Sequence, residues 1–440
     1  MTPAIKLALV GVAFFVVLLM GHPLAFTMGG LAVILGYGLW GNPNILNLFS
    51  YSAVTLSTSV AYVCAPLFIF MGAVLERSEA ADDMFESMYI LFGRLRGGLA
   101  IATVVICTLL AAATGIIGAS ITMMVMLSLP AMQKHSYDLK LACGTIMASG
   151  CLGTIIPPSI ILVIYGAQAQ VSIGKLFAGG LGAGLLLSAL YVGYILLKAL
   201  KNPEVAPAIS AEEAGKYSTR QKLYMVVKSV IPTLGLILLV LGSIVFGIAT
   251  PTEAAALGCV GSLILAAAHR KLSWRMIKEC CFVTLKTNCM IMWIILGASM
   301  FTSVFLGLGG NTIITNLVTG LALSRWFVLG VILIILLIMG MFIDSYGVLL
   351  IGIPIFTPIV YALGFEPVWF GIIYAVTIQA SYLSPPIAYA AFYVKGVAKE
   401  DIPIDLIYSA GLPFLMLQVL ALIILSVFPG IITWLPNKML

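Results

Sequence analysis

The sequence predicts an all-α polytopic membrane protein built from two inverted halves, each with a re-entrant hairpin and a broken helix. Three observations predict it: an apolar composition, two apolar runs each broken by a Pro-Pro pair, and prolines that recur at one spacing. Of 440 residues, 62% are apolar and 9% are charged, a balance that excludes a soluble globular chain. Apolar runs of about 18 residues or more recur from end to end, each long enough to cross a bilayer.

Two Pro-Pro pairs interrupt apolar runs at corresponding places. Pro157-Pro158 breaks the run 141–168, and Pro385-Pro386 breaks the run 367–395, 228 residues later. Proline donates no backbone hydrogen bond, and its ring clashes with a continuing helix. The same offset of 228 relates four further pairs: Pro23 and Pro251, Pro130 and Pro358, Gly30 and Gly258, Tyr165 and Tyr393. An internal duplication is therefore predicted, with a binding site at the two matched breaks.

Ten spans and two hairpins account for the apolar runs. The spans are expected at 4–20, 24–41, 52–75, 141–168, 176–200, 223–248, 252–268, 286–307, 367–395 and 404–428. The runs 99–132 and 327–360 are each about 34 residues long, too long for one straight span and too short for two with a loop. Each is interrupted in its middle, so both are expected to be re-entrant hairpins with tips buried in protein. Amphipathic stretches at 79–96 and 309–323 precede them and suit the membrane interface.

The basic residues orient these elements. With the linker 201–222 in the cytoplasm, 18 of the 22 basic residues fall inside, and those outside are Lys6, Lys175, Arg325 and Lys438, as the positive-inside rule requires. Each half has five spans, so the first repeat (1–200) and the second (223–440) are inverted, and both termini face outward. The net charge of +6 reflects this orientation, and no nucleic-acid binding is expected.

The tips and breaks concentrate oxygen ligands. Freed carbonyls and small hydroxyls suit a hard monovalent cation. The ion-binding candidates are Thr114, Ser120, Thr122, Gly153, Thr154, Asp344, Ser345, Ser381 and Ser384, and the substrate-binding candidates are Ser149, Pro157, Pro158, Ser159, Pro385 and Pro386. The alternative for each single hydroxyl is a bond to its own helix backbone or a helix–helix contact. No catalytic or transition-metal site is expected, since the eight cysteines form no CxxC pair and the three histidines lie far apart.

Asp344 is the sharpest of these candidates. No other charged residue lies between Arg325 and Glu366, and an intramembrane carboxylate indicates function by default. It would bind a cation, carry a proton or order the hairpin tip; the alternative is a purely structural carboxylate. Glu253, which follows Pro251 at the start of a span, is expected to be structural.

Five motifs are spread over the whole chain. They are APLFIFMGAVLE at 65–76, GTIIPPS at 153–159, TPTEAAA at 250–256, GMFIDS at 340–345 and SPP at 384–386. Together they resemble the large membrane subunit, of the DctM/SiaM type, of tripartite ATP-independent periplasmic (TRAP) transporters. The run GASITMMVMLSLP at 118–130 also looks like the Ser-x-Thr hairpin tip of divalent anion/sodium symporters, whereas Ile116-Ile117 stands where small hydroxyl residues are expected.

This resemblance implies an elevator-type transporter fold in the bacterial inner membrane, with both termini periplasmic, and coupling to sodium ions. It also implies a small four-helix membrane subunit of the DctQ/SiaQ type, a periplasmic substrate-binding protein, and a small organic acid anion as cargo. Neither tips nor breaks carry an arginine, so weak binding by hydroxyls and helix N-termini is expected.

Three alternatives stay open. A one-component divalent anion/sodium symporter would need no partner subunits. An intramembrane protease would need a second membrane aspartate, or a histidine inside the bundle, and neither is evident. A membrane scaffold would have no need of two matched breaks.

Overall fold

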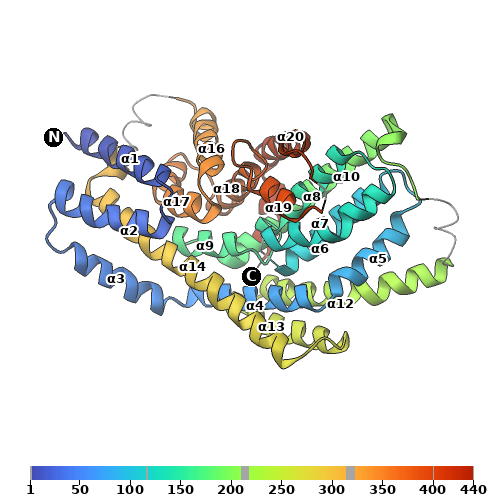
Figure 1. The fold of residues 1–440 in the computed structure, drawn as a ribbon. Helices are drawn as coiled ribbons and strands as arrows, with labels where there is room; N and C mark the ends of the chain where they lie inside the picture. Colours follow the sequence, from blue (N-terminus) through green and yellow to red (C-terminus); the bar gives the residue numbers. More distant parts are fainter. Residues whose placement is uncertain (1, 115–116, 210–217, 314–322, 400, 440) are drawn as a thin grey trace.

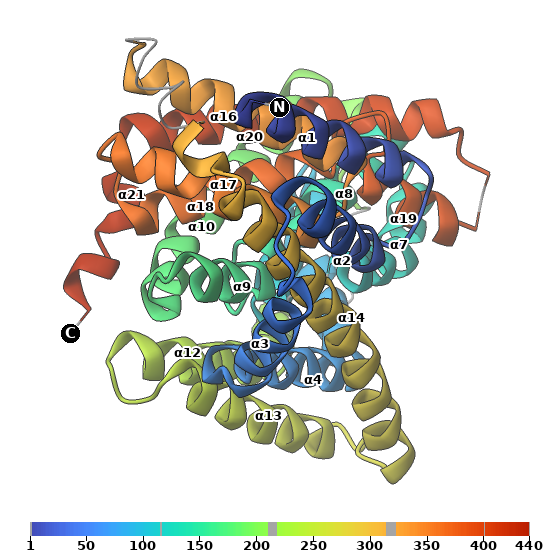
Figure 2. The ribbon, with the colours of Figure 1, turned by 90° about the vertical axis from the view of Figure 1, so that its left-hand side faces the viewer.

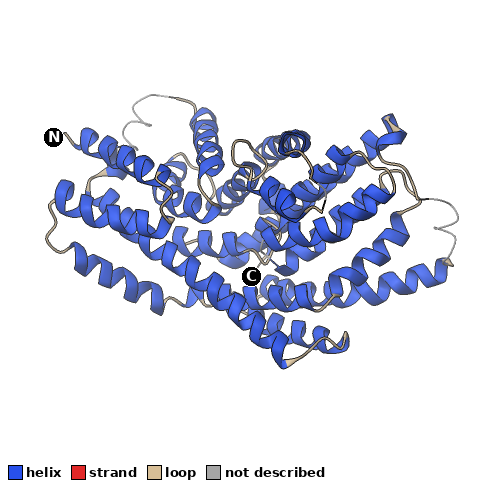
Figure 3. Cartoon of the chain, viewed as in Figure 1, coloured by secondary structure: helices blue, strands red, loops and turns tan. Residues whose placement is uncertain are grey.

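The computed structural model describes residues 2–114, 117–209, 218–313, 323–399 and 401–439. Over these ranges the chain consists of helices and loops, with no β-strand among them (Figure 3). Eight of the described helices are long and apolar enough to cross a membrane, by length and composition. The prediction of an all-α polytopic membrane protein is therefore confirmed.

The helices follow the order of the apolar runs (Figure 1). The first half contains α1 (Pro3–Leu19), α2 (Leu24–Leu35), the π-helical turn η1 (Gly36–Trp40), α3 (Ile45–Thr58), η2 (Val60–Tyr62), α4 (Cys64–Arg77), α5 (Ala80–Phe92), α6 (Gly98–Thr114), α7 (Ile117–Lys134), α8 (Leu139–Gly150), η3 (Cys151–Thr154), α9 (Ile160–Ala169), α10 (Ile173–Lys201) and η4 (Pro203–Val205). The second half contains α12 (Thr219–Val245), α13 (Pro251–Ala268), α14 (Trp274–Gly307), α16 (Arg325–Phe342), α17 (Ser345–Ala362), α18 (Pro367–Ser381), α19 (Tyr389–Val397), α20 (Ile404–Val427), α21 (Gly430–Thr433) and η5 (Pro436–Lys438).

Side-chain caps start several of these helices. The Asp138 carboxylate accepts the Leu141 amide at 2.8 Å where α8 begins. At α13, the Glu253 carboxylate accepts the Thr250 amide at 2.8 Å, and Thr250 Oγ1 accepts the Glu253 amide at 3.3 Å. Such a capping box satisfies amides that have no partner in the first turn. The structural role predicted for Glu253 is thereby confirmed.

Helix bounds recur between the halves at the spacing of 228. Shifted by 228, α7 (117–134) becomes 345–362, the bounds of α17; α6 (98–114) becomes 326–342, against 325–342 for α16. Likewise α9 (160–169) becomes 388–397, against 389–397 for α19. Each half thus contains the same succession of a two-helix hairpin, a broken helix and a long closing helix.

Equivalent helices exchange partners between the halves. Helix α7 packs on α19, and α17 packs on α9; α8 packs on α20, and α18 on α10. We call α6–α10 with α16–α20 the central group. A flanking group of α2, α4, α13 and α14 shows the same exchange, because α2 packs on α14 while α4 packs on α13. In Figure 2, α4 and α13 lie on the lower side of the molecule, the helices α16–α18 lie on the upper side, and α14 runs between them.

Two expected spans and one expected hairpin differ from the predictions. The span expected at 52–75 is two helices, α3 and α4, because Ser59 is extended (φ −76°, ψ 113°) and only the short turn η2 connects them. The span expected at 286–307 begins earlier, at Trp274, with Ser273 capping α14. The run 327–360 forms two helices of 18 residues each, since the turn between them takes only Ile343 and Asp344. The run is too short for two helices of this length with a longer loop, but a turn of two residues leaves room for both.

The amphipathic stretch expected at 79–96 is α5, with Asp82 and Asp83 in its first turn. Most of the stretch 309–323 lies outside the described residues, as do residues 210–217 of the linker 201–222 and the tip of the first hairpin at 115–116.

Candidate functional site

The first break runs from Cys151 to Ser159 and is closed by side chains. Helix α8 passes into the 3₁₀ turn η3, and α9 starts again at the N-cap Ser159. Ser159 Oγ donates to the Thr154 carbonyl at 2.5 Å and accepts the Leu162 amide at 3.4 Å. The Pro157-Pro158 bond is cis. All residues of this break are buried, so Ser159 serves the backbone that the prolines free.

The second break runs from Tyr382 to Ala388 between α18 and α19. Ser384 Oγ donates to the Ala380 carbonyl at 3.0 Å, and the Tyr408 hydroxyl donates to the Pro386 carbonyl at 2.9 Å. The Pro385-Pro386 bond is cis, as in the first break. Unlike the prolines of the first break, Pro385 and Pro386 are exposed.

The tip of the second hairpin lies against the second break. Asp344 takes the N-cap position of α17, and its carboxylate faces the amides of Tyr346 and Gly347 without the geometry of a cap hydrogen bond. The Ser345 side chain is buried and lies near the Tyr382 hydroxyl. Helices α16 and α18 approach closely at Gly340, where a Cβ would lie 2.2 Å from Ser381 Oγ. This approach places Asp344 and Ser345 beside the start of the second break.

The first hairpin is described from Ile117 onward. Ser120 is buried and Thr122 is half-buried, both near the start of α7. Gly118 lies against the Tyr393 ring, since a Cβ there would be 2.8 Å from it. Thr114 ends α6, and its side chain lies outside the described part. The start of α7 thus meets α19, the helix that follows the second break.

A cavity of about 680 Å³ lies between the central and the flanking groups. The central group supplies the starts of α7 and α9, Thr154 of the first break, the second hairpin tip and the residues around the second break. The flanking group supplies the start of α2 and the middle of α14. Of the predicted site residues, the cavity lining includes Thr154, Asp344 and Ser345. It does not include the following predicted residues: Ser120, Thr122, Ser149, Gly153, Pro157, Pro158, Ser159, Ser381, Ser384, Pro385 and Pro386.

Several predicted hydroxyls donate to their own helix. Ser149 Oγ donates to the Thr145 carbonyl at 2.5 Å, and Ser381 Oγ donates to the Ile378 carbonyl at 2.6 Å. The alternative of a backbone bond therefore describes these two side chains, as it does Ser384. A hydroxyl that donates its proton still offers its lone pairs, so the arrangement is compatible with coordination of a cation.

A buried polar chain runs from Thr154 into the central group. Thr154 Oγ1 lies 2.9 Å from the Cys151 carbonyl and 3.3 Å from Gln379 Oε1. Gln379 Nε2 lies 3.4 Å from the Tyr191 hydroxyl, which also receives Gln418 Nε2 at 2.9 Å. Gln379 and Gln418 are fully buried.

The number of available protons decides the orientation of the Gln379 carboxamide in this series of hydrogen bonds. The single Thr154 proton cannot serve two acceptors, and the Tyr191 proton is left unused. The two ends of a carboxamide are alike in shape, so hydrogen bonding decides between them. If the Gln379 carboxamide is turned by 180°, Gln379 Nε2 donates to Thr154, Tyr191 donates to Gln379, and Thr154 donates to Cys151. Each of these bonds then has one donor and one acceptor, and Thr154 Oγ1 is held between two partners at the cavity wall.

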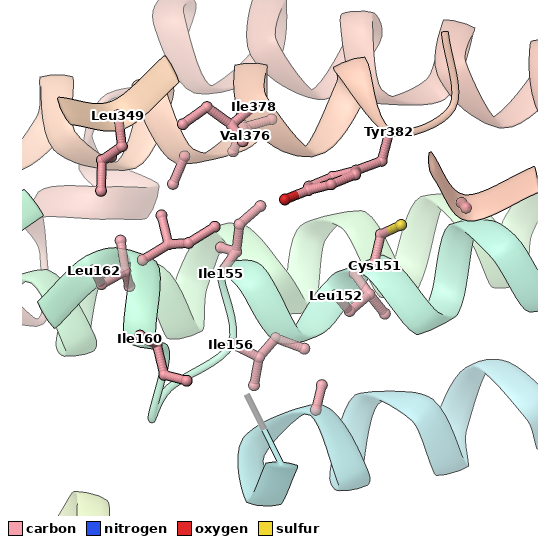
Figure 4. Close-up of a cluster of buried hydrophobic side chains, with 14 of the residues drawn as sticks. Cys151, Leu152, Ile155, Ile156, Ile160, Leu162, Leu349, Val376, Ile378 and Tyr382 are labelled. Atoms are coloured by element: carbon pink, nitrogen blue, oxygen red, sulfur yellow. The ribbon is translucent and has the colours of Figure 1, made fainter. Parts of the chain in front are cut away.

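The sequence analysis did not identify this hydrogen-bonded series of side chains or the aromatic lining of the cavity. A signal for the series was present in the sequence, since Gln379 and Gln418 are amides inside apolar runs. The aromatic lining residues are Phe26, Trp293, Tyr346, Tyr382, Tyr389 and Tyr393. In Figure 4 the Tyr382 ring reaches from the second break toward the apolar residues of the first, among them Ile155 and Ile156. In the sequence, Tyr393 is one residue of a pair at the 228-residue spacing, and the structure shows that it also lines the cavity.

Among the described residues, no group of three His, Cys, Asp or Glu side chains could hold a metal ion. The oxygen-rich tips and breaks described above are of another kind, suited to weakly held cations.

Comparisons with known proteins agree on one family. The model of the DctM component of tripartite ATP-independent periplasmic transporters matches residues 11–431. The chain is 33% identical to the C4-dicarboxylate TRAP transporter large permease protein DctM of Pseudomonas aeruginosa, over 90% of this chain and 91% of that one. It is 30% identical to the isethionate TRAP transporter permease protein DctMQ of Oleidesulfovibrio alaskensis, over 94% of this chain and 65% of that one.

The fold is similar to that of the solved YdaH transporter of Alcanivorax borkumensis, with a TM-score of 0.65 at 15% identity, over 95% of this chain and 98% of that one. At that identity the likeness concerns the fold alone. The family match extends over nearly the whole chain and includes all five motifs quoted above. The chain therefore belongs to the DctM family, the large permease component of TRAP transporters.

Proposed function

We propose that this chain is the large permease subunit of a sodium-coupled importer of a small organic acid in the bacterial inner membrane. The observation that carries the proposal is the cavity between the central and flanking groups. Both helix breaks and the second hairpin tip meet there, together with Asp344. Discontinuous helices that meet at one cavity are the arrangement by which secondary transporters bind ions and substrate.

Sodium is proposed to bind at the tips and breaks beside this cavity. The ligands would be the backbone oxygens of the breaks and the lone pairs of Ser120, Thr154, Ser345, Ser381 and Ser384. A hard monovalent cation needs several such oxygens and no strong base. Asp344 would contribute negative charge near the ion.

An inverted repeat and an elevator movement are proposed for the two halves. The recurrence of helix bounds and the exchange of helix partners are what two inverted, symmetry-related halves would produce. The two runs 99–132 and 327–360 would be re-entrant hairpins entering from opposite sides. The central group would then carry the site past the flanking group, with the cavity at their boundary.

Two partner proteins are proposed, a small four-helix subunit of the DctQ type and a periplasmic binding protein. The name of the DctMQ relative joins the two membrane components, and this chain covers 65% of that relative. Transport of organic acids is supported by family names such as C4-dicarboxylate permease. We also propose that both termini of the chain face the periplasm.

The test is uptake into proteoliposomes that contain the chain and its partners, under an inward sodium gradient. Uptake is expected only with sodium and with all components present. Uptake that persists when potassium replaces sodium would overturn the coupling. Full uptake by the chain alone would instead favour a one-component anion/sodium symporter.

A further inference from the structure

The charge of the cavity wall is unusual for the binding of an organic acid. Of the 18 side chains that line the cavity in the described part of the chain, only Asp344 is charged, and none is Lys, Arg or His. The basic residues nearest in sequence are Lys286 and His22, and His22 lines an adjoining hollow that shares Pro23 and Phe26 with the cavity. Among the described residues, no cationic side chain therefore lines the cavity where it could hold an acid group.

Aromatic rings supply both walls. Phe26 and Trp293 of the flanking group form an edge-to-face pair with ring centroids 6.0 Å apart. Tyr382 and Tyr389 of the central group form another, with centroids 6.1 Å apart. Tyr346 and Tyr393 complete the lining on the central side. The faces of aromatic rings carry partial negative charge and attract cations, and quaternary or delocalised nitrogen centres above all.

A dicarboxylate does not match this surface. It would bring two negative charges beside the Asp344 carboxylate, in a cavity whose described lining holds no cationic side chain to balance them. Sodium ions at the breaks would compensate one acid group. The second would have only hydroxyls as partners, and those do not replace its water shell at equal cost.

We propose that the transported acid is a zwitterion, a small solute with one singly charged acid group and one cationic nitrogen centre. This inference rests on the transport function proposed above. The cationic end lies beside Asp344 and the rings of Tyr346, Tyr382 and Tyr389. The acid end lies toward the hydroxyls of Thr154 and Ser345 and the proposed sodium ions. The solute then leaves no net charge unpaired in the cavity.

The experiment measures ligand binding to the purified full-length chain in lipid nanodiscs, in sodium chloride and in potassium chloride. The probes are ectoine and glycine betaine as zwitterions, and succinate as a dianion. The readouts are the thermal midpoint and the tryptophan fluorescence, because Trp293 lines the cavity. With sodium, both zwitterions are expected to bind at least about tenfold more tightly than succinate, the scale of one desolvated cation–π contact.

Variants identify the groups that discriminate. Tyr389→Leu is expected to weaken zwitterion binding about tenfold. Asp344→Asn is expected to weaken zwitterions and to strengthen succinate, an inversion that a merely structural carboxylate would not produce. The matched control is Tyr51→Leu, since Tyr51 is an exposed tyrosine on α3 outside the cavity lining, and it is expected to leave both affinities unchanged.

The outcomes separate this inference from the proposed function. Sodium-dependent binding of succinate without binding of zwitterions would overturn the zwitterion and leave the transporter standing. Sodium-dependent stabilisation with no binding of either class would also overturn it. Binding of no probe, with no response to sodium, would count against the proposed function itself.

Discussion

The two breaks share one sequence device but differ in exposure. In the first, every residue from Cys151 to Ser159 is buried, and Ser159 closes the gap with two hydrogen bonds. In the second, Pro385 and Pro386 are exposed, and Tyr382 and Tyr389 turn toward the cavity. Only Thr154 of the first break reaches that cavity. The two breaks thus share the backbone interruption but differ in their surroundings, so we call the first the sealed break and the second the open break.

The two breaks contribute different groups to the cavity. The sealed break presents one hydroxyl, held from behind by Gln379. The open break presents rings and lies beside the only charged side chain of the described lining, Asp344. We therefore expect the open break to determine which substrate binds and the sealed break to determine how well the ion site is ordered.

The largest effect is expected at the tip that faces the open break. Asp344→Ala should reduce uptake by the complete system at least about 100-fold, the equivalent of roughly 2–3 kcal/mol for the loss of one buried charged group. The protein should remain folded and inserted. Asp344→Asn should retain some activity with an altered sodium dependence, because it keeps one acceptor oxygen. Wild-type rate and sodium dependence in Asp344→Ala would show that this carboxylate is incidental.

A second prediction concerns the sealed break. Gln379→Leu removes the partner of both Thr154 and Tyr191 and should lower the stability of the protein by about 1–3 kcal/mol, the cost of leaving buried polar groups unpaired. The sodium concentration for half-maximal uptake should rise more than that for substrate. The matched control is Gln168→Leu, at a half-buried glutamine that bonds Tyr62 at 3.0 Å on α9. Equal effects of both variants on sodium dependence would remove the special role of Gln379.

A third prediction tests the difference in exposure directly. In a background without the two exposed cysteines, Cys281 and Cys289, a cysteine is placed at each break. Ile387→Cys at the half-buried end of the open break should react with a polar maleimide at least about tenfold faster than Ser159→Cys, since thiol reactivity requires access. Labelling at equal rates would mean that both breaks open to water, and the comparison would fail.

The smallest effect is expected at the surface beyond the open break. Lys395, in the last turn of α19, pairs with Asp401 and also donates to the Ile402 carbonyl at 2.8 Å. The hydrogen bond and charge of Lys395 hold the pKa of Asp401 below its ordinary value. The contribution of this pair is therefore present above the ordinary carboxyl pKa and is lost as pH falls through the lowered one. Asp401→Asn should lower the thermal midpoint only slightly at pH 7, since exposed pairs contribute little, and the difference should vanish in acid. A difference that grows in acid would contradict the pairing.

Periodicity and proline chemistry predicted the helical class and the two breaks, because these depend on local backbone rules. Pro157-Pro158 and Pro385-Pro386 interrupt helices wherever the chain lies. The break at Ser59 was not predictable in the same way: no proline or glycine marks it, and the helices around it are equally apolar.

For the site, the sequence predicted three of the residues that line the cavity, Asp344, Thr154 and Ser345, since they are rare polar groups in apolar runs. The aromatic walls were not predicted, because the tyrosines and Trp293 are ordinary residues of membrane helices. Only the packing of α14 and α2 against the central group shows which rings face inward.

The exchange of partners between the halves has a consequence for biosynthesis. Helix α7 ends at Lys134, and its partner α19 begins at Tyr389, so more than 250 residues separate them along the chain. Helix α9 of the first half likewise packs on α17, which belongs to the second half. Contacts this distant in sequence form late and slowly, and domains normally fold in the order of their synthesis. The first half must therefore stay in the membrane with the faces of α7 and α9 that pack on the second half uncovered, until the ribosome has made almost the whole chain.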